Sequence, residues 1–300
     1  MRIAIVGDPH ISTGFRARID DYLQTVLNKI NYIAENNDAV IFLGDVFDTS
    51  AMPTYVFNAT YKALSKYSHK FHTILGNHDM FHRNVKSLHR TTIGSLDLTG
   101  IIKVHTKPFE LGGVTFVPVM TDDEFESIPC DDDNDSVLLC HKYYEMMVCP
   151  EESFDDSELK DLNYKYVFMG HDHMPYEPLD LGNTILYRPG SLTRTTVDKY
   201  NEKRDIRYYV LETGTMEVYA DIVPSLPSSE VYLNGSFAEK EVARHKAYND
   251  RANIGKLLAR FDRQLTSNIS LEDVLRKGKV PEDIIMYLRD LHRLHNIKYN

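Results

Sequence analysis

The 300-residue sequence predicts an α/β layered domain. The first observation is a series of apolar runs of four or five residues, rich in Val, Ile, Leu and Phe. Such runs are typical of strands buried on both faces. The second is that segments with helical spacing of apolar residues lie between the first runs. The third is a β-rich stretch from Thr184 onward, which indicates a second sheet packed on the first.

Strands and helices alternate in the first half of the chain. The helix over Asp20–Asn36 is predicted by apolar residues three or four positions apart. A second helix is expected over Thr54–Tyr67, because it would begin just after Pro53. The expected strands are Ile3–Val6, Ala39–Leu43, His72–Leu75, Val137–Cys140, Tyr166–Met169, Thr184–Tyr187, Arg207–Glu212 and Met216–Val223.

Charge divides the chain into two parts. The formal net charge is −10, but residues 236–300 carry 13 Lys and Arg against nine Asp and Glu. Helical spacing returns after Pro224–Ser229, at Ala238–Leu265 and Pro281–Asn296. We therefore expect a main domain over residues 1–230 and a small, helical, basic region over residues 231–300. An acidic body repels nucleic-acid phosphates unless metal ions or a basic strip offset its charge, and the C-terminal region is a candidate strip.

Several protein classes are disfavoured by the composition. The longest apolar run, Ala39–Leu43, is far shorter than the roughly 20 residues of a membrane span, and the N-terminal run is too short for a signal peptide. The three cysteines lack the CxxC spacing of a zinc module and leave one unpaired in any disulfide scheme. We expect a cytoplasmic enzyme or partner-binding protein that does not associate with membranes.

Polar clusters follow five of the predicted strands at their C-terminal ends. An isolated Asp-x-His or a single His is ordinarily a surface or capping group, but five clusters in this order are not independent accidents. The ends of strands are where ligand-binding groups converge in α/β sheets, so we expect one shared site. The clusters are Asp8-Pro9-His10, Gly44-Asp45-Val46-Phe47-Asp48, Gly76-Asn77-His78-Asp79, His141 and Gly170-His171-Asp172-His173.

These clusters resemble the signature of the calcineurin-like metallophosphoesterases, which runs Asp-x-His, Gly-Asp-x-x-Asp, Gly-Asn-His-Asp/Glu, His and Gly-His-x-His. The resemblance implies a four-layer αββα sandwich, with two mixed sheets flanked by helices and a small helical C-terminal region. It also implies a two-metal site in which the Asp45 carboxylate bridges. One metal would be held by Asp8, His10, Asp45 and His173, and the other by Asp45, Asn77, His141 and His171.

The expected donors explain the expected chemistry. Imidazole, carboxylate and amide ligands without thiolate suit two divalent ions, with Mn²⁺ favoured and Mg²⁺, Fe²⁺ and Zn²⁺ as alternatives. Such paired ions activate water and clamp a phosphate for in-line attack. The resemblance gives His78 the role of assisting the leaving oxygen, with Asp79 orienting its ring and Asp48 holding ligating histidines. For Asp48 and Asp79, ordinary loop or helix-capping roles are the alternative.

Within this family, the motifs are most similar to the SbcD-type DNA-repair nucleases, including their compact bacteriophage forms. Thr49 follows Asp48 where protein phosphatases carry Arg, and Phe47 precedes Asp48 as in SbcD-type enzymes. Tyr187–Ser191 is similar to the Asn-Pro-Gly-Ser turn of that group, although Arg188 replaces the Asn. The resemblance implies a DNA exonuclease and endonuclease active in recombination and repair.

The same resemblance implies partners. These are DNA, an SMC-like ATPase of the SbcC type, and a second copy of the chain joined through helices such as Asp20–Asn36 and Thr54–Tyr67. The segments Ser270–Arg276 and Pro281–Asn296 would form the helical pair that docks on the ATPase. Two alternatives stay open, namely a small-molecule phosphodiesterase or phosphatase with the same site, and a non-catalytic scaffold of the same fold.

Overall fold

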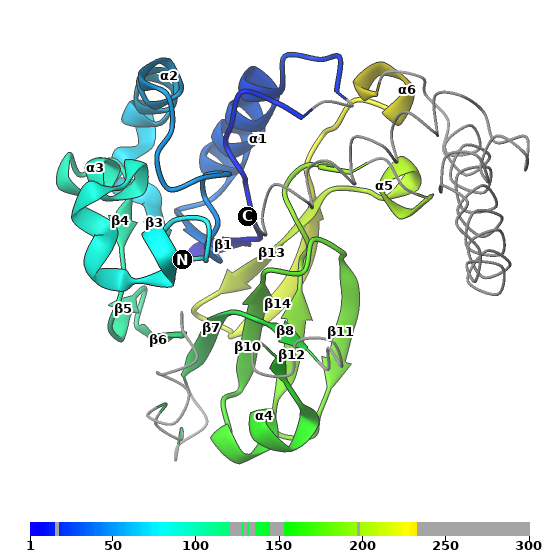
Figure 1. Ribbon diagram of the computed structural model, residues 1–300. Helices are drawn as coiled ribbons and strands as arrows, with labels where there is room; N and C mark the ends of the chain where they lie inside the picture. The colour runs from blue at the N-terminus through cyan, green and yellow to red at the C-terminus, as the bar shows by residue number, and fades with distance from the viewer. Residues whose placement is uncertain are drawn as a thin grey trace, which may run out of the picture. The chain divides into compact units, whose positions relative to one another are not determined.

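The computed structural model describes residues 1–15, 18–119, 128, 131, 136–144, 153–196 and 199–232 (Figure 1). The chain divides into two units, Met1–Gly235 and Ser236–Asn300. The helices expected at Ala238–Leu265, Ser270–Arg276 and Pro281–Asn296 lie outside the described residues and stay predictions. Among the helices that the structure describes, we find none with the length and apolarity needed to span a bilayer.

The first sheet is mixed and six-stranded, in the order β14-β13-β1-β2-β3-β4. Its four early strands run parallel, whereas β13 pairs antiparallel with both β1 and β14. The strands are β1 (Arg2–Val6), β2 (Ala39–Phe42), β3 (Phe71–Thr73), β4 (Lys103–Val104), β13 (Arg207–Glu212) and β14 (Glu217–Ile222).

The second sheet is also mixed and six-stranded, in the order β11-β12-β10-β7-β6-β5. Strands β12, β10, β7 and β6 run parallel, and the two edge strands run antiparallel to their neighbours. A separate short pair joins β8 and β9. The strands are β5 (Phe109–Leu111), β6 (Val114–Val119), β7 (Val137–His141), β8 (Tyr143–Tyr144), β9 (Ser153–Phe154), β10 (Tyr166–Gly170), β11 (Tyr176–Asp180) and β12 (Ile185–Arg188).

The two sheets confirm the expected α/β class, but the expected division of strands between them was wrong. We expected the second sheet to consist of the strands from Thr184 onward. Instead β13 and β14 complete the first sheet, where Ala4 of β1 lies opposite Val210 of β13. The second sheet is built mainly from the middle of the chain. Pairing between β1 and β13 joins segments about 200 residues apart, and no local sequence pattern signals such a pairing.

Helices cover the outer faces of both sheets. Helix α1 begins where the Asp21 side chain accepts a hydrogen bond from the Gln24 backbone N–H, a typical N-cap. The helix expected over Thr54–Tyr67 is shorter than predicted, because α2 passes into a 3₁₀ turn at Ser65. The helices are α1 (Tyr22–Asn36), α2 (Thr54–Leu64), η1 (Ser65–Lys70), η2 (Phe81–Arg83), η3 (Val85–Arg90), α3 (Thr92–Leu98), α4 (Asp156–Leu162), α5 (Lys199–Lys203) and α6 (Ser228–Val231).

Successive side chains of β7 in the second sheet point to opposite faces, and this alternation shows how the layers pack. On β7, Val137 and Leu139 belong to the large core shared with the first sheet, whereas Leu138 and Cys140 pack with Leu159 of α4. The two faces of this sheet are therefore both buried, one against the first sheet and one under α4. The apolar face of α1 packs in the large core on the first sheet (Figure 1). The result is the four-layer arrangement of helix, sheet, sheet and helix.

A pair of histidines at the first sheet, half-buried His72 and buried His105, contacts β5 of the second sheet. His72 of β3 places its Nδ1 2.9 Å from Nε2 of His105. The ring of His105 stacks on Phe109 of β5, with centroids 3.5 Å apart. Burial lowers the pKa of His72 to about 4 and that of His105 to about 3, and the positive charge of Lys103 acts in the same direction. Both rings are therefore neutral in the folded protein near neutral pH.

This pair predicts a loss of stability in mild acid. In the unfolded chain these histidines take up protons near pH 6.5, whereas in the folded protein they do so only near pH 4 and pH 3. Protonation therefore favours the unfolded chain, and the free energy of unfolding falls as the pH drops from about 6.5 toward 4. We expect the free energy of unfolding in urea to fall between about pH 7.5 and pH 5. In His105→Gln, which keeps one hydrogen-bonding partner for His72, the fall should be smaller by about 1 kcal/mol. An equal fall in both proteins would contradict the assignment.

Candidate metal centre

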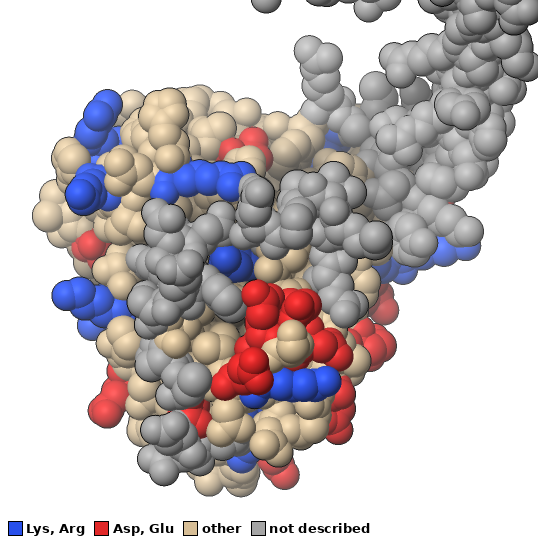
Figure 2. All heavy atoms as spheres, turned by 60° about the horizontal axis from the view of Figure 1, so that its bottom comes forward, with Lys and Arg blue, Asp and Glu red and all other residues tan. Residues whose placement is uncertain are grey.

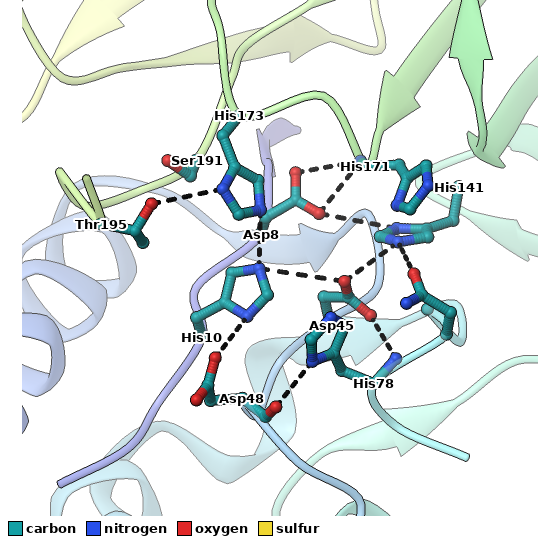
Figure 3. Close-up of polar contacts among 12 residues, drawn as sticks. Asp8, His10, Asp45, Asp48, His78, His141, His171, His173, Ser191 and Thr195 are labelled. Atoms are coloured by element: carbon teal, nitrogen blue, oxygen red, sulfur yellow. Dashed lines mark hydrogen bonds and ion pairs between the residues drawn. The ribbon is translucent and has the colours of Figure 1, made fainter. Parts of the chain in front are cut away.

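The five polar clusters meet where the C-terminal ends of strands from both sheets come together. Asp8 and His10 follow β1, and Asp45 follows β2 in the first sheet. From the second sheet come His141, the last residue of β7, and His171, which follows β10. The side chains of these residues point toward one another (Figure 3). The expected shared site is therefore a junction between two sheets rather than one edge of a single sheet.

The backbone is strained at four of these positions. Asp8, His10, Asp45 and His171 have φ values of 29°, 46°, 47° and 85°, in a region that residues with a Cβ rarely adopt. Such conformations persist only where the surrounding structure enforces them, and they concentrate at functional sites. Gly76 makes the close approach to Asp45 feasible, because a Cβ at this position would collide with the Asp45 backbone N and Oδ1.

One group of donors contains Asp8, His10 and His173, whose ligand atoms all lie within 4.8 Å of one another. The Nε2 atoms of His10 and His173 are 2.8 Å apart. Asp45 Oδ2 lies 3.8 Å from His10 Nε2, at the edge of this group. Two imidazole nitrogens and two carboxylates thus converge within reach of one cation.

A second group contains Asp45, His141 and His171, again within 4.8 Å of one another. His141 Nε2 lies 3.2 Å from Asp45 Oδ2 and 3.1 Å from Asn77 Oδ1. Asp45 therefore lies between the two groups, as expected for a bridging carboxylate. All seven ligand positions expected from the sequence are brought together, three in each group and Asn77 beside the second.

The histidine rings are oriented so that Nε2 faces the centre. His141 Nδ1 donates to the Leu43 carbonyl at 2.7 Å, and His10 Nδ1 lies 3.4 Å from Asp48 Oδ1. His173 Nδ1 lies 3.3 Å from Thr195 Oγ1. Ligating histidines typically hold one ring nitrogen on such a partner and leave the other for the metal. This orientation, and a donor set of imidazole, carboxylate and amide groups, fits divalent metal ions.

Electrostatic coupling within the cluster is strong. Burial raises the pKa of Asp8 to about 6, although His141 opposes this. Burial would also raise the pKa of Asp45, but the attraction of His141 and His10 outweighs it and holds that pKa well below its usual range. Burial disfavours the charged form of His141, yet Asp45 and Asp8 raise its pKa to about 10. The buried carboxylates thus draw positive charge to this position.

Asp8 also joins the two sheets directly. Its two carboxylate oxygens accept hydrogen bonds from the His171 backbone N–H, at 3.0 and 3.1 Å. Its Oδ1 lies 3.6 Å from His141 Nδ1. The fully buried Asp8 carboxylate therefore connects the end of β1 to the ends of β7 and β10.

His78 and Asp48 lie beside the two donor groups. His78 is exposed beside the buried cluster, and its Nδ1 lies 2.6 Å from the Asp48 backbone carbonyl. Its backbone N–H donates to Asp45 Oδ1 at 2.8 Å. With Nδ1 held on this carbonyl, Nε2 of the exposed ring is the atom available to a substrate. The Asp48 carboxylate contacts His10, in agreement with a role in holding a ligating histidine.

Asp79 does not orient the His78 ring, and this expectation was wrong. Its carboxylate is fully buried and accepts from the backbone N–H groups of Gly76, Val46 and Phe47, at 3.0, 3.4 and 3.3 Å. Burial and the nearby Asp45 raise its pKa to about 7. The side chain therefore fixes the loops that follow β2 and β3, and the Asp48 carbonyl takes the position next to His78.

Sequence reasoning missed two residues behind the centre. Thr195 contacts His173 through its hydroxyl, and Arg204 donates to the carbonyl oxygens of His173, Ser191 and Thr193, at 3.2, 3.1 and 2.6 Å. Thr195 lies 22 positions beyond His173 in the sequence, and Arg204 lies 31 positions beyond it. The only nearby signal was the Pro189-Gly190-Ser191 turn, which begins this segment.

Gly76 allows a test of the position of the Asp45 carboxylate. We expect Gly76→Ala to weaken Mn²⁺ binding by about tenfold or more, because the new methyl group displaces the Asp45 carboxylate. Isothermal titration calorimetry measures this change. Gly214→Ala is the matched control, since a Cβ at Gly214 meets no atom within 4 Å. Equal affinity in both variants would contradict the role given to Asp45.

The Thr195 hydroxyl allows a test of how His173 is oriented. Thr195→Val keeps the shape but removes the hydroxyl next to His173, and Mn²⁺ affinity should fall by about tenfold. Thr195→Ser retains an oxygen and should restore most of the affinity in the same calorimetric titration. If the Thr195→Val variant binds Mn²⁺ as tightly as the Thr195→Ser variant does, the hydroxyl does not orient His173.

Several solved structures are similar to this chain at low sequence identity. They include TT1561 of Thermus thermophilus, at 14% identity and a TM-score of 0.47, covering 74% of this chain and 99% of that one. The hypothetical protein PH1004 from Pyrococcus horikoshii has 14% identity and a TM-score of 0.41, covering 85% and 93%. The 5'-nucleotidase precursor from Thermus thermophilus has 12% identity and a TM-score of 0.40, covering 84% and 59%.

A search of curated proteins found no match. The family model described as calcineurin-like phosphoesterase matches residues 1–175, which is more than half of the chain. The matched range contains every residue of the two donor groups, together with Asp48, Asn77, His78 and Asp79. The chain therefore belongs to the calcineurin-like phosphoesterase family.

Proposed function

We propose that the protein is a metal-dependent DNA phosphodiesterase, with exonuclease and endonuclease activity, that acts as the nuclease subunit of an SbcCD-like recombination or repair complex. Phosphoester hydrolysis is the chemistry of the family to which the chain belongs. The observation that carries the proposal is the pair of largely buried donor groups on either side of Asp45, with the exposed His78 beside them.

Each residue of the site has a distinct task in this reaction. Two divalent ions, when bound, polarise the phosphodiester and activate water. Asp45 contacts His10 of one donor group and His141 of the other, and Asp8 links the end of β1 to His171 of the second sheet. His78, oriented by the Asp48 carbonyl that accepts from Nδ1–H, offers Nε2 to the phosphate, and in the imidazolium form it gives the Nε2 proton to the departing oxygen. Its exposure allows contact with a substrate as large as a polynucleotide.

The distribution of charge supports a polyanionic substrate. Residues 54–108 contain eight Lys and Arg against two acidic residues, one of which is the buried Asp79, in a chain whose net charge is −10. Arg83, Lys86 and Arg90 of η2 and η3 are exposed and follow the Asn77-His78-Asp79 motif directly. Figure 2 shows many of the acidic side chains of one face gathered apart from a group of Lys and Arg. A basic surface next to the site favours phosphates on either side of the scissile bond.

The second candidate is a small-molecule phosphodiesterase or phosphatase with the same site. The acidic balance of residues 1–235, with 21 Lys and Arg against 35 Asp and Glu, favours it, because this part of the chain repels long polyanions. The site residues themselves serve either substrate equally well.

The partners and location follow from the same resemblance. We propose an SMC-like ATPase of the SbcC type as the partner of residues 231–300, and a homodimer formed through α1 and α2. The exposed Tyr55 and Tyr61 of α2 support an interface on that helix. The proposed location is the cytoplasm of a bacterium or of a phage-infected cell.

The proposal is tested with end-labelled single-stranded and duplex DNA, in Mn²⁺, in Mg²⁺ and in chelator. We expect shortening from the ends that requires Mn²⁺, and a fall of about 10²-fold or more in His78→Ala with Mn²⁺ binding unchanged. His69→Ala, which removes an exposed histidine from η1, is the matched control and should retain activity.

A small diester, bis-p-nitrophenyl phosphate, distinguishes the two candidates. Its hydrolysis together with DNA cleavage supports the nuclease. If it is hydrolysed while DNA stays intact even with the ATPase partner added, the enzyme acts on small molecules. Full DNA cleavage by His78→Ala would show that the assigned role of His78 is wrong.

A further inference from the structure

A cavity of about 490 Å³ is lined by α1 and the segment that follows β14, both within the first unit. Its volume lies in the range of small-molecule sites, roughly 300–1,000 Å³. The α1 residues that line it are three or four positions apart and share one helix face. None of the lining residues belongs to the candidate metal centre. They are Thr25, Asn28, Lys29 and Tyr32 of α1, and Val223, Pro224, Ser225 and Leu226.

Lys29 is the unusual group in this cavity. Its side chain is buried, with the residue only 7% exposed, and Nζ donates to the Leu192 carbonyl at 3.2 Å. Among the described residues, this is the one acceptor that contacts Nζ, and no carboxylate forms an ion pair with it. Asp20 is the nearest acidic influence, but both of its oxygens contact the Arg18 guanidinium, at 2.8 and 2.6 Å.

A buried lysine without a carboxylate partner is costly unless a ligand supplies negative charge. Burial and the positive charges of Arg194, Arg18 and Arg204 lower the pKa of Lys29 to about 7. The same charges give the inner wall of the cavity a positive potential, which repels cations and favours anions. Two N–H bonds of the ammonium group have no acceptor among the described residues.

The outer part of the cavity is apolar. Tyr32 and Leu226 are 37% and 45% exposed, and Pro224 lies between Val223 and Ser225 on the same wall. The nearby polar groups are already engaged, since Thr25 donates to Asp20 and Asn28 accepts from Gln24. An anionic group at Lys29 with a flat apolar body against the outer wall therefore matches this surface best.

The cavity is connected to the metal centre through one residue. The Leu192 carbonyl accepts from Lys29, and the Leu192 backbone N–H donates to the carbonyls of Gly7 and Asp8, at 3.1 and 3.2 Å. The neighbouring Ser191 backbone N–H donates to the His173 carbonyl at 3.1 Å. A ligand that competes with Leu192 for Lys29 would thus act on the segment that holds Asp8 and His173.

We propose that this cavity binds a small organic anion at Lys29, and that its occupancy changes the affinity of the metal centre for divalent ions. Coupling between two sites is reciprocal, so bound metal changes the anion affinity by the same factor. This proposal does not depend on the identity of the phosphoester substrate.

Calorimetric titration of the Mn²⁺-loaded full chain tests the binding. The probes are benzoate, phenylphosphonate and acetate, which separate the carboxylate, the phosphonate and the apolar ring. We expect benzoate or phenylphosphonate to bind more tightly than acetate, which lacks the ring. Lys29→Met should weaken this binding by about tenfold or more. Lys66→Met, which removes an exposed lysine from η1, should leave it unchanged.

A second variant tests the proposal even if Lys29→Met does not fold. Ser225→Phe fills the cavity and leaves the Lys29–Leu192 hydrogen bond in place, so it should abolish anion binding while Mn²⁺ still binds. In the wild type, saturating probe should shift the Kd for Mn²⁺ by about threefold or more, and Ser225→Phe should remove this shift.

Two results would overturn the proposal. One is that no probe binds at about 10 mM, and the other is that Lys29→Met and Ser225→Phe bind the probes as the wild type does. The second result would place the anion at the metal ions themselves. If the probe binds in the cavity but leaves the Kd for Mn²⁺ unchanged, the coupling through Leu192 is wrong.

Discussion

The rest of the structure depends on the burial of two carboxylates where the sheets meet. Asp8 and Asp45 are almost inaccessible to solvent, and a buried carboxylate is tolerated only when hydrogen bonds and positive groups surround it. Asp8 obtains these from the second sheet, through the His171 N–H, and Asp45 from His78 N–H and His141. The same contacts therefore fix the relative position of the sheets and assemble the donors. The positive φ values at Asp8 and Asp45 are the local cost of this arrangement.

A second set of contacts fixes the residues behind the donors. Arg204 donates to the carbonyls of His173, Ser191 and Thr193. Tyr22 of α1 donates to the His10 carbonyl, and its hydroxyl also contacts Thr193. These groups satisfy carbonyls that no strand partner reaches, because the chain is irregular here. The positions of His10 and His173 thus depend on α1 and on the segment before β13, both distant in sequence.

The sequence pattern of an apolar run followed by a polar residue predicted those parts of the site that depend on neighbouring residues in the chain. Each strand followed by Asp, Asn or His was recognisable, because apolar runs and the polar residue after them are adjacent in sequence. Long-range pairing was not recognisable, and β13 and β14 were assigned to the wrong sheet for this reason. Asp79 was misassigned because sequence adjacency to His78 says nothing about which way a side chain points, and this one points into the core. Thr195 had no signal of its own beyond the nearby Pro189-Gly190-Ser191 turn, since its contact with His173 depends on the course of an irregular segment.

The charge of the centre also explains how an acidic protein can act on phosphates. Imidazoles that ligate a metal ion are neutral, so as metal ligands the donor groups contribute only the charge of their two carboxylates, about −2. Two divalent ions would change this charge to about +2. Bound metal ions should therefore raise the affinity for a phosphate, and a bound phosphate should raise the affinity for the metal ions. Residues 54–108 are net basic, whereas 33 of the 35 acidic residues of the first unit lie outside this segment. Under the proposed nuclease function, selectivity for a long strand over a small ester would come from phosphates that reach η2 and η3 while one phosphate stays beside His78.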